Sequence, residues 1–231
     1  MNLLAIDTST ENCSVAIYSK LGIKSISHLT PQHHAEMVIE MADTLLKNSG
    51  LKREDLQGIS FGSGPGSFTG VRIAASTAQG LALGLNLKVC AISSLESLAL
   101  QALEGVDEDY AVASIDARMG EVYIAVYKRK GNGLVEVLAP EVLKPQDACD
   151  KVRETIGVSH AVGGGSGMEI LYEAGLNKNI RKRSSFPDAE YIVKLGSQAF
   201  TDGKEIDPED ALPLYVRNEV TWKKVSEQGK H

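Results

Sequence analysis

The sequence predicts an α/β protein built from two similar halves, and one repeated pattern carries this prediction. The N-terminus reads LLAIDTSTENCSVAIYSK, in which an apolar run ends at Asp7, a Thr/Ser turn follows, and a second apolar run starts at Cys13. Further along, AVASIDARMGEVYIAVYKRK repeats the pattern with Asp116 in the place of Asp7. Each stretch is typical of a strand that ends at an aspartate, turns tightly and returns as an antiparallel strand. A repeated unit of this kind indicates an internal duplication.

In the first half, the pattern after the hairpin alternates between strand and helix. Short apolar runs predict strands, and apolar positions that recur every three or four residues predict helices. The expected elements are a strand over Ser25–Leu29, a helix over His33–Asn48, a strand over Gln57–Phe61, a helix over Thr69–Leu85, a strand over Lys88–Ser93 and a helix over Leu95–Ala102.

The second half repeats this alternation after its own hairpin. The expected elements are a strand over Val135–Leu143, a helix over Gln146–Thr155, a strand over Ala161–Gly163, a short helix over Met168–Ala174, and a helix over Ala189–Asp202 that Gly203 ends. The acidic stretch Glu104–Asp109 joins the two halves. We therefore expect an N-terminal α/β lobe over residues 1–103 and a C-terminal α/β lobe over residues 110–231.

Two α/β halves that each open with an Asp-ended hairpin predict a particular fold class. It is the duplicated actin-like ATPase fold (ASKHA, ribonuclease H-like), which hexokinase and Hsp70-type ATPases share. In that fold the nucleotide lies in the cleft between the lobes, held by the two hairpin turns. The turns after Asp7 and Asp116 are therefore the first places to look for a site.

Composition narrows the range of functions. The chain has 231 residues, of which 43% are apolar and 23% charged, with a net charge of −6. Proteins that grip nucleic acid by themselves usually carry a basic face. The basic concentrations here are confined to Lys178–Arg183 and Arg217–Lys224, and a solvated charged face is the simpler explanation for both. We therefore expect no tight RNA binding by this chain alone.

The location expected from the sequence is the cytoplasm. No basic and apolar leader precedes a small-residue cleavage site, so we expect no signal peptide. The most apolar stretch, Leu81–Ile92, is interrupted by polar residues and glycine and is too short to cross a membrane. Cys13, Cys90 and Cys149 lie far apart and form no CxxC pair, which favours a reducing compartment.

The glycine-rich stretch FGSGPGSFTGVR, over Phe61–Arg72, fails two common phosphate-binding templates. A dinucleotide fingerprint needs a third glycine where Ser67 stands, and a P-loop needs a lysine that follows neither Gly66 nor Gly70. A tight turn from strand to helix explains these glycines better, with Ser67 or Thr69 as the helix cap.

Two helices carry the features of a partner surface. Over Thr69–Leu85, small residues recur every four positions, which allows either burial against the chain's own sheet or a close contact with another helix. Over His33–Asn48, apolar residues cover an arc of roughly 200°, where a helix that covers only its own core needs a little over ~100°. Deep burial within the chain is the alternative. The candidate interface residues are Met37, Val38, Met41, Leu45, Gly70, Ala74, Ala78 and Ala82. If they form one interface, Met41→Glu should break assembly and spare the fold.

Several long motifs resemble one family along nearly the whole chain. LLAIDTSTENCSVAIY, FGSGPGSFTGVRIAASTAQGLALGL, IDARMGEVYIAVY and the late PLYVRNEVTWKK are similar to the bacterial TsaB family, also called YeaZ. The resemblance implies a non-catalytic subunit that works with TsaD and TsaE to attach a threonylcarbamoyl group to the adenosine beside the anticodon of certain tRNAs. It also implies that the chain binds TsaD through a helical interface, pairs with a second copy when TsaD is absent, and reaches tRNA only through the complex.

TsaD, which TsaB proteins resemble, carries a His-x-x-x-His pair that can ligate a metal. In this chain, Ser94 and Leu98 stand where those histidines would be, and neither can replace them. The five histidines lie elsewhere, at positions 28, 33, 34, 160 and 231. We therefore expect neither a metal site nor a catalytic residue.

The resemblance leaves a nucleotide site open. The turn after Asp7 has no glycine, whereas the turn after Asp116 contains Arg118 and a glycine, and Ala161–Gly167 is glycine-rich. The candidate cleft residues are Asp7, Thr8, Ser9, Asp116, Arg118, Gly163, Gly164 and Gly165. They form either a vestigial or partner-completed nucleotide site or simply structural turns. We expect no tightly bound cofactor, with ATP or ADP held only at an interface with TsaD, where Arg118 would be the polar residue that matters.

Two rival functions belong to other classes. The first is an independent ATP-dependent small-molecule kinase of the same fold, in which Asp7 or Asp116 binds a metal or acts as a base. The second is a metallopeptidase.

Overall fold

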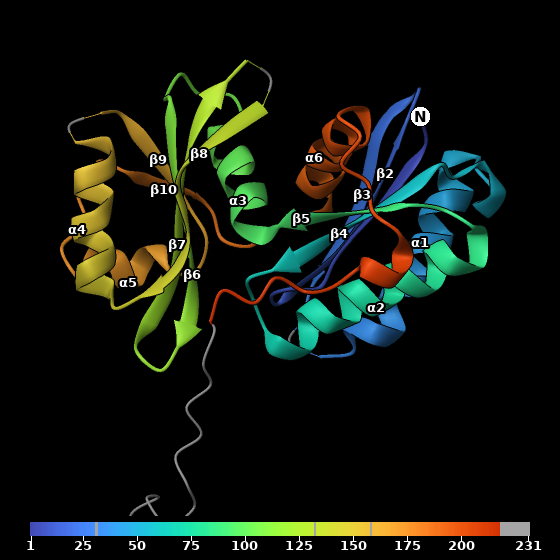
Figure 1. Cartoon of the computed structure of the whole chain (residues 1–231), viewed down its shortest axis with the longest axis horizontal. Coiled ribbons are helices and arrows are strands. Elements are labelled where there is room, and N and C mark those ends of the chain that lie inside the picture. The colour runs from blue at the N-terminus through green and yellow to red at the C-terminus, as the bar shows by residue number, and fades with distance from the viewer. Residues whose placement is uncertain (31, 132, 158, 218–231) are drawn as a thin grey trace, which may run out of the picture.

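The computed structural model describes residues 1–30, 32–131, 133–157 and 159–217. It shows two α/β lobes side by side, each with a five-stranded sheet (Figure 1). The part of the expected C-terminal lobe that follows Arg217, including most of the basic concentration Arg217–Lys224, lies outside the described residues.

The strand orders of the two sheets confirm the internal duplication. The first sheet has the order β3-β2-β1-β4-β5 and the second, read from its other edge, the order β8-β7-β6-β9-β10. In both sheets, read in these directions, the first two strand pairs are antiparallel and the last two are parallel. The strands of the first sheet are β1 (Leu3–Asp7), β2 (Asn12–Ser19), β3 (Gly22–Leu29), β4 (Gly58–Gly64) and β5 (Val89–Ser93). Those of the second are β6 (Tyr110–Arg118), β7 (Glu121–Lys130), β8 (Gly133–Leu143), β9 (Ala161–Gly164) and β10 (Arg181–Ser184).

The helices lie at matching places in the two halves. They are α1 (His34–Ser49), α2 (Phe68–Leu85), α3 (Ser94–Leu103), α4 (Pro145–Ile156), α5 (Met168–Glu173) and α6 (Ala189–Thr201), with the 3-10 turns η1 (Arg53–Asp55) and η2 (Pro208–Asp210). Side chains fix three of the starts, because Ser67, Ser93 and Asp188 each accept a hydrogen bond from a backbone N–H in the first turn that follows. All the expected helices are present, whereas the sequence patterns missed the short strand β10 and both 3-10 turns.

The last helix of each half packs on the sheet of the other half. Helix α3 contacts β6, β7 and β9 of the second sheet, and α6 contacts β1, β2, β4 and β5 of the first. Their buried side chains belong to those cores, as with Leu98 in the second lobe and Ile192 in the first. The two lobes therefore exchange helices, and neither lobe consists only of the sequence half that was expected to form it.

The first sheet lies between two helical layers. Helices α1 and α2 cover one face and α6 covers the other (Figure 1). The sides of α1 and α2 that point away from the first sheet lie on the molecular surface. No helix among the described residues has the length and hydropathy needed to cross a bilayer.

Candidate functional site

The glycine-rich stretch packs directly on the turn that joins β1 to β2. A Cβ atom on Gly66 would lie 2.3 Å from the carbonyl oxygen of Ser9, and one on Gly70 would lie 2.0 Å from that of Thr8. The contact is also hydrogen-bonded, since the Ser67 N–H donates to the Ser9 carbonyl at 2.7 Å and the Thr8 hydroxyl donates to the Gly70 carbonyl at 2.7 Å. These glycines therefore allow two backbones to touch.

This packing favours the structural-turn alternative for the first turn over a nucleotide cleft. Asp7, Thr8 and Ser9 are each 0% exposed, because the loop before α2 covers them. A Cβ on Gly62 would lie 2.2 Å from Asp7 Oδ2, so strand β4 packs directly against the carboxyl group. No surface of these three residues is left for a phosphate in this structure.

The glycines expected in the second half of the cleft are likewise buried. A Cβ on Gly163 would meet the Met168 side chain, one on Gly164 would lie 2.9 Å from the Leu98 carbonyl oxygen, and one on Gly165 would lie 2.0 Å from that of Ser114. They allow β9 to approach α3 and β6 closely. The geometry of this segment thus favours the structural-turn alternative.

Two of the expected cleft residues remain at the surface. The Arg118 guanidinium is 2.9 Å from Asp116 and 3.7 Å from Glu11, which lies in the β1–β2 turn of the other lobe. The Arg118 N–H also donates to the Asp116 carboxylate at 2.8 Å. Arg118 therefore pairs with carboxylates from both lobes.

The buried Asp7 is electrostatically unusual. Burial raises the pKa of its carboxyl group from 3.8 to about 6, although hydrogen bonds from Ser9 to Oδ1 lower it in part. Those bonds come from the Ser9 N–H and hydroxyl, each at 2.7 Å. The other oxygen, Oδ2, has no hydrogen-bond partner among the described residues. Ionised Asp7 is therefore a cost to the fold.

The stability of the folded chain is expected to fall as pH rises from about 4 to about 6, between the pKa of Asp7 in the unfolded chain and its raised pKa in the folded chain. Below about pH 3, Asp7 is protonated in both folded and unfolded chains, and well above pH 6 it is ionised in both, so burial of the charge costs ~3 kcal/mol at pH 7. Asp7→Asn keeps an oxygen for the Ser9 hydrogen bonds and cannot ionise. Urea unfolding at pH 4 and pH 7 should show a loss of free energy of unfolding that is ~2.5 kcal/mol larger for wild type than for this variant. Asp43→Asn, which removes a carboxylate from an ion pair with Arg53 and leaves Asp7 in place, is the control. Equal pH dependence of wild type and Asp7→Asn would contradict the expectation.

The residues expected to form a partner surface are buried within the chain, which is a correction. Val38, Leu45, Ala74, Ala78 and Ala82 belong to the core of the first lobe, and Gly70 is buried against Thr8. Met41 is only 6% exposed, with its Sδ 3.8 Å from the Sγ of Cys13, and Met37 is partly buried against the same core.

The wide apolar arc on α1 has a physical explanation inside the chain. The helix packs on β2 and β3 with one side and on α2 with another, so it buries a wider arc than a helix with one neighbour. Met41→Glu should therefore disturb the fold itself, contrary to the original expectation.

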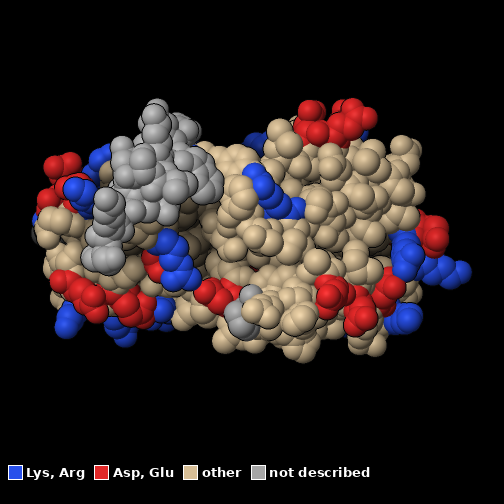
Figure 2. All heavy atoms as spheres, turned by 90° about the horizontal axis from the view of Figure 1, so that it is seen from below, with Lys and Arg blue, Asp and Glu red and all other residues tan. Residues whose placement is uncertain are grey.

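The outer side of α1 and α2 forms a different surface, which we call the α1–α2 face. On α2 it presents Phe68, 61% exposed, and Leu83, 55% exposed, with the exposed Ser76, Gly80 and Gly84 between or beside them. On α1 it presents Ala35 and Ile39. The single charged residue of α2 is Arg72. Figure 2, seen from below, shows a broad uncharged area over these helices, with one cationic side chain near its middle and acidic ones at its edges.

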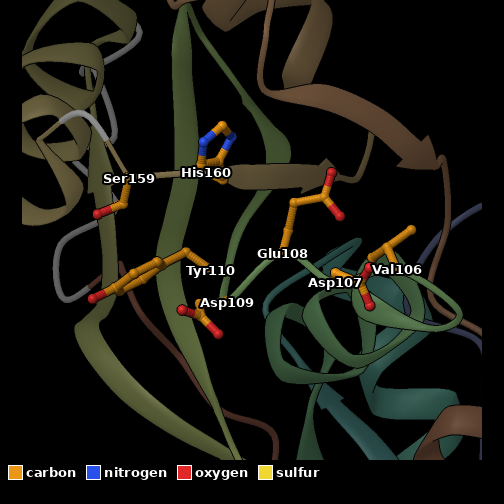
Figure 3. A pocket seen from close by; sticks show the side chains of 7 residues that line it. All are labelled: Val106, Asp107, Glu108, Asp109, Tyr110, Ser159 and His160. Atoms are coloured by element: carbon orange, nitrogen blue, oxygen red, sulfur yellow. The ribbon is translucent and has the colours of Figure 1, made fainter.

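A hollow of 690 Å³ lies beside the segment that joins α3 to β6 (Figure 3). Its lining is Val106, Asp107, Glu108, Asp109, Tyr110, Ser159 and His160. Among the residues that the structure describes, no group of three His, Cys, Asp or Glu side chains is placed to hold a metal ion.

Three side chains of the basic run Lys178–Arg183 contact neighbouring groups, two of them carboxylates. Lys182 is 2.6 Å from Glu169, Arg181 is 3.7 Å from Glu108, and Arg183 donates to the Glu104 carbonyl at 3.0 Å. This favours the solvated-face explanation of the run over a nucleic-acid site.

Comparisons with known proteins agree with one another. The family model described as "TsaD: tRNA N6-adenosine threonylcarbamoyltransferase" matches residues 25–194. The tRNA threonylcarbamoyladenosine biosynthesis protein TsaB of Escherichia coli (strain K12) is 38% identical, covering 97% of this chain and 98% of that protein. TsaB of Haemophilus influenzae is 36% identical, covering 97% of each chain.

The solved structures give the same picture. "YeaZ from Pseudomonas aeruginosa" superposes with a TM-score of 0.84 at 34% identity, covering 93% of this chain and 99% of that one. A second structure, described as an uncharacterized protein with similarity to peptidase YEAZ from Pseudomonas aeruginosa, gives a TM-score of 0.88 at 34% identity and covers 94% and 99%. Together with the two sheets, these matches confirm the two-lobed actin-like fold.

Proposed function

The chain belongs to the TsaB (YeaZ) family of tRNA threonylcarbamoyladenosine biosynthesis proteins, and from this premise we propose that it is the non-catalytic, activating subunit of the modifying complex. It binds a TsaD-type catalytic subunit through the α1–α2 face. The catalytic subunit then transfers the threonylcarbamoyl group to N6 of the adenosine beside the anticodon. A TsaE-type protein completes the complex, and tRNA reaches this chain only within it.

The observation that carries this proposal is the composition of the α1–α2 face. Exposed Phe68, Leu83 and Ile39 would lose contact with water in a complex, and Gly80 and Gly84 would let a second helix come close. A Cβ at either glycine would meet nothing within 4 Å, so the chain's own packing does not require glycine there. The close approach of a helix backbone from the partner would explain why glycine stands at both positions.

The likeness between the chain and TsaD supports the choice of partner. The TsaD model covers residues 25–194, a range that includes both α1 and α2. A partner of the same fold offers a matching helix pair, and two similar surfaces can meet about an approximate two-fold axis. The same geometry would accept a second copy of this chain when the TsaD-type subunit is absent.

Two core residues support a non-catalytic role. Ser94 and Leu98, which stand where TsaD-like proteins would carry their histidine pair, are both 0% exposed. The Ser94 hydroxyl donates to the Ser9 hydroxyl at 3.0 Å, and Leu98 belongs to the core of the second lobe. This position therefore serves packing. We propose that ATP or ADP is held at the interface between this chain and the TsaD-type subunit, and not by this chain alone.

The proposal is tested by mixing the purified chain with the TsaD-type subunit of the same organism. Size-exclusion chromatography with light scattering should show a stable complex at micromolar concentrations, and a reconstituted assay should transfer the threonylcarbamoyl group to tRNA only when both proteins are present. The chain alone should give no transfer. Absence of a complex, or full transfer without this chain, would contradict the proposed role.

A further inference from the structure

The last described segment of the chain connects the two lobes on the side of the α1–α2 face. We call residues 211–217 the strap. It follows η2 along the first lobe, where the Leu214 N–H donates to the Ser63 carbonyl at 2.7 Å and the Arg72 Nε donates to the Tyr215 hydroxyl at 3.1 Å. It then crosses to the β6–β7 hairpin of the second lobe (Figure 1).

At the second lobe, Arg217 holds the hairpin by several contacts. Its guanidinium donates to the Ala117 carbonyl at 3.4 Å, contacts the Met119 sulfur at 3.3 Å and forms an ion pair with Glu121. The side chain of Arg217 is 20% exposed and that of Glu121 is 34% exposed, so solvent screens this pair less than a surface pair.

The turn between β6 and β7, which Arg217 contacts, has an unusual backbone conformation. Arg118, Met119 and Gly120 all have positive φ angles, of 62°, 56° and 76°. Left-handed conformations at non-glycine residues are strained, and they persist where the surrounding contacts hold them. The Arg217 contacts to Ala117 and Met119 help to keep the turn in this conformation.

The strap also borders a hollow between the lobes. This hollow has a volume of 510 Å³ and is lined by Ser93, Glu96, Tyr127, Glu136, Pro140, Leu214, Tyr215 and Val216, which come from both lobes and the strap. The lobes are therefore not packed solidly against each other here. Movement of one lobe against the other would change this space and the path of the strap.

We propose that the strap couples docking on the α1–α2 face to the angle between the lobes, an inference that rests on the proposed function. Arg72 lies on that face, 3.6 Å over the ring of Phe68, and its side chain also holds Tyr215. A partner that covers Phe68 and Arg72 restricts the position of Tyr215 through its bond to Arg72. Because Arg217 follows two residues later and binds Glu121, the same restriction applies to the position of the second lobe. With its contacts to Arg72 and Glu121 formed, the strap favours one angle between the lobes. It also keeps Phe68 and Arg72 of α2 in the arrangement that the partner binds.

Linkage makes this coupling reciprocal. If a loosened strap lets the lobes sample several angles, only the fraction with the strap in place binds the partner, and the apparent Kd rises by the inverse of that fraction. By the same free energy, the bound partner must draw the lobes back to the single angle.

The experiment measures the lobe angle and the affinity separately. Spin labels on Leu21→Cys and Glu154→Cys report one distance between the lobes, since both sites are exposed and the native cysteines are buried. Glu121→Gln removes the ion-pair partner of Arg217 and should broaden the distance distribution and weaken binding of the TsaD-type subunit about fivefold. Glu169→Gln, which removes the partner of Lys182 on α5, is the matched control and should change neither.

A double-mutant cycle tests the path through Tyr215. Tyr215→Phe removes only the hydroxyl that Arg72 holds, so Glu121→Gln should weaken binding no further in that background. Adding the TsaD-type subunit to Glu121→Gln should narrow the distance distribution again. A narrow distribution in free Glu121→Gln, or unchanged affinity, would overturn the coupling. If the wild-type chain fails to bind, the proposed function is what fails, and the distance measurement still tests the strap.

Discussion

A negative charge at position 83 is expected to abolish binding to the TsaD-type subunit without unfolding the chain. Leu83 is 55% exposed on the outer side of α2, so Leu83→Glu leaves the core intact and keeps good helix propensity. In the complex, the carboxylate would be buried among apolar groups without a partner, which costs several kcal/mol, enough to weaken a micromolar contact about a hundredfold or more. Calorimetry should show no binding, and homodimerisation should be lost in parallel.

The matched variant for this test is Met41→Glu on α1. Met41 is 6% exposed in the core of the first lobe, so the same substitution should unfold the chain. Circular dichroism melting should show a native-like transition for Leu83→Glu and none for Met41→Glu. A folded Leu83→Glu that binds normally would place the docking surface elsewhere, and a folded Met41→Glu would contradict the core described above.

Gly70→Ala is expected to destabilise the chain by about 3 kcal/mol or more. The added methyl group would lie 2.0 Å from the Thr8 carbonyl oxygen, which is backbone within the β1–β2 turn and cannot swing aside. The clash would force apart α2 and the turn and would also strain the Thr8 hydrogen bond to the Gly70 carbonyl. Urea unfolding should show the loss directly.

Gly80→Ala provides the control in the same helix. A Cβ there meets nothing within 4 Å, so the change should stabilise the chain by about 0.5–1 kcal/mol through helix propensity. The same variant should weaken complex formation, because Gly80 lies on the α1–α2 face. Equal stability of the two variants would show that the contact between Gly70 and Thr8 is not tight.

The sequence predicted the duplication and most elements because both rest on local patterns. The Asp7 and Asp116 hairpins repeat within short windows, and the strands and helices have distinct apolar periods. The exchange of α3 and α6 was not predicted, since an amphipathic pattern shows that a helix has an apolar side but not which sheet that side covers. The short strand β10 (RKRS) was missed because it is charged and has no apolar alternation.

The candidate site was predicted only in part. The sequence pattern singles out the helices α1 and α2 and favours a partner for their apolar residues, whereas the structure packs these residues in the core of the first lobe. One signal in the sequence was informative: if Gly70, Ala74, Ala78 and Ala82 form the inner side of α2, then Phe68, Arg72 and Leu83 must lie elsewhere on the helix, toward solvent. The strap has no periodicity, so its contacts could not be read from the sequence.

The exchanged helices also set the timing of folding during synthesis. When β5 leaves the ribosome, the first sheet can acquire α1 and α2 on one face, but the residues that cover the other face are in α6, near the end of the chain. At ordinary elongation rates, roughly a hundred further residues take on the order of 5–20 s. Through that interval Leu3, Ala5 and Ala16 stay uncovered on the nascent chain, where they are a target for chaperones. A message truncated before α6 should therefore yield an insoluble product, even though its first sheet is complete.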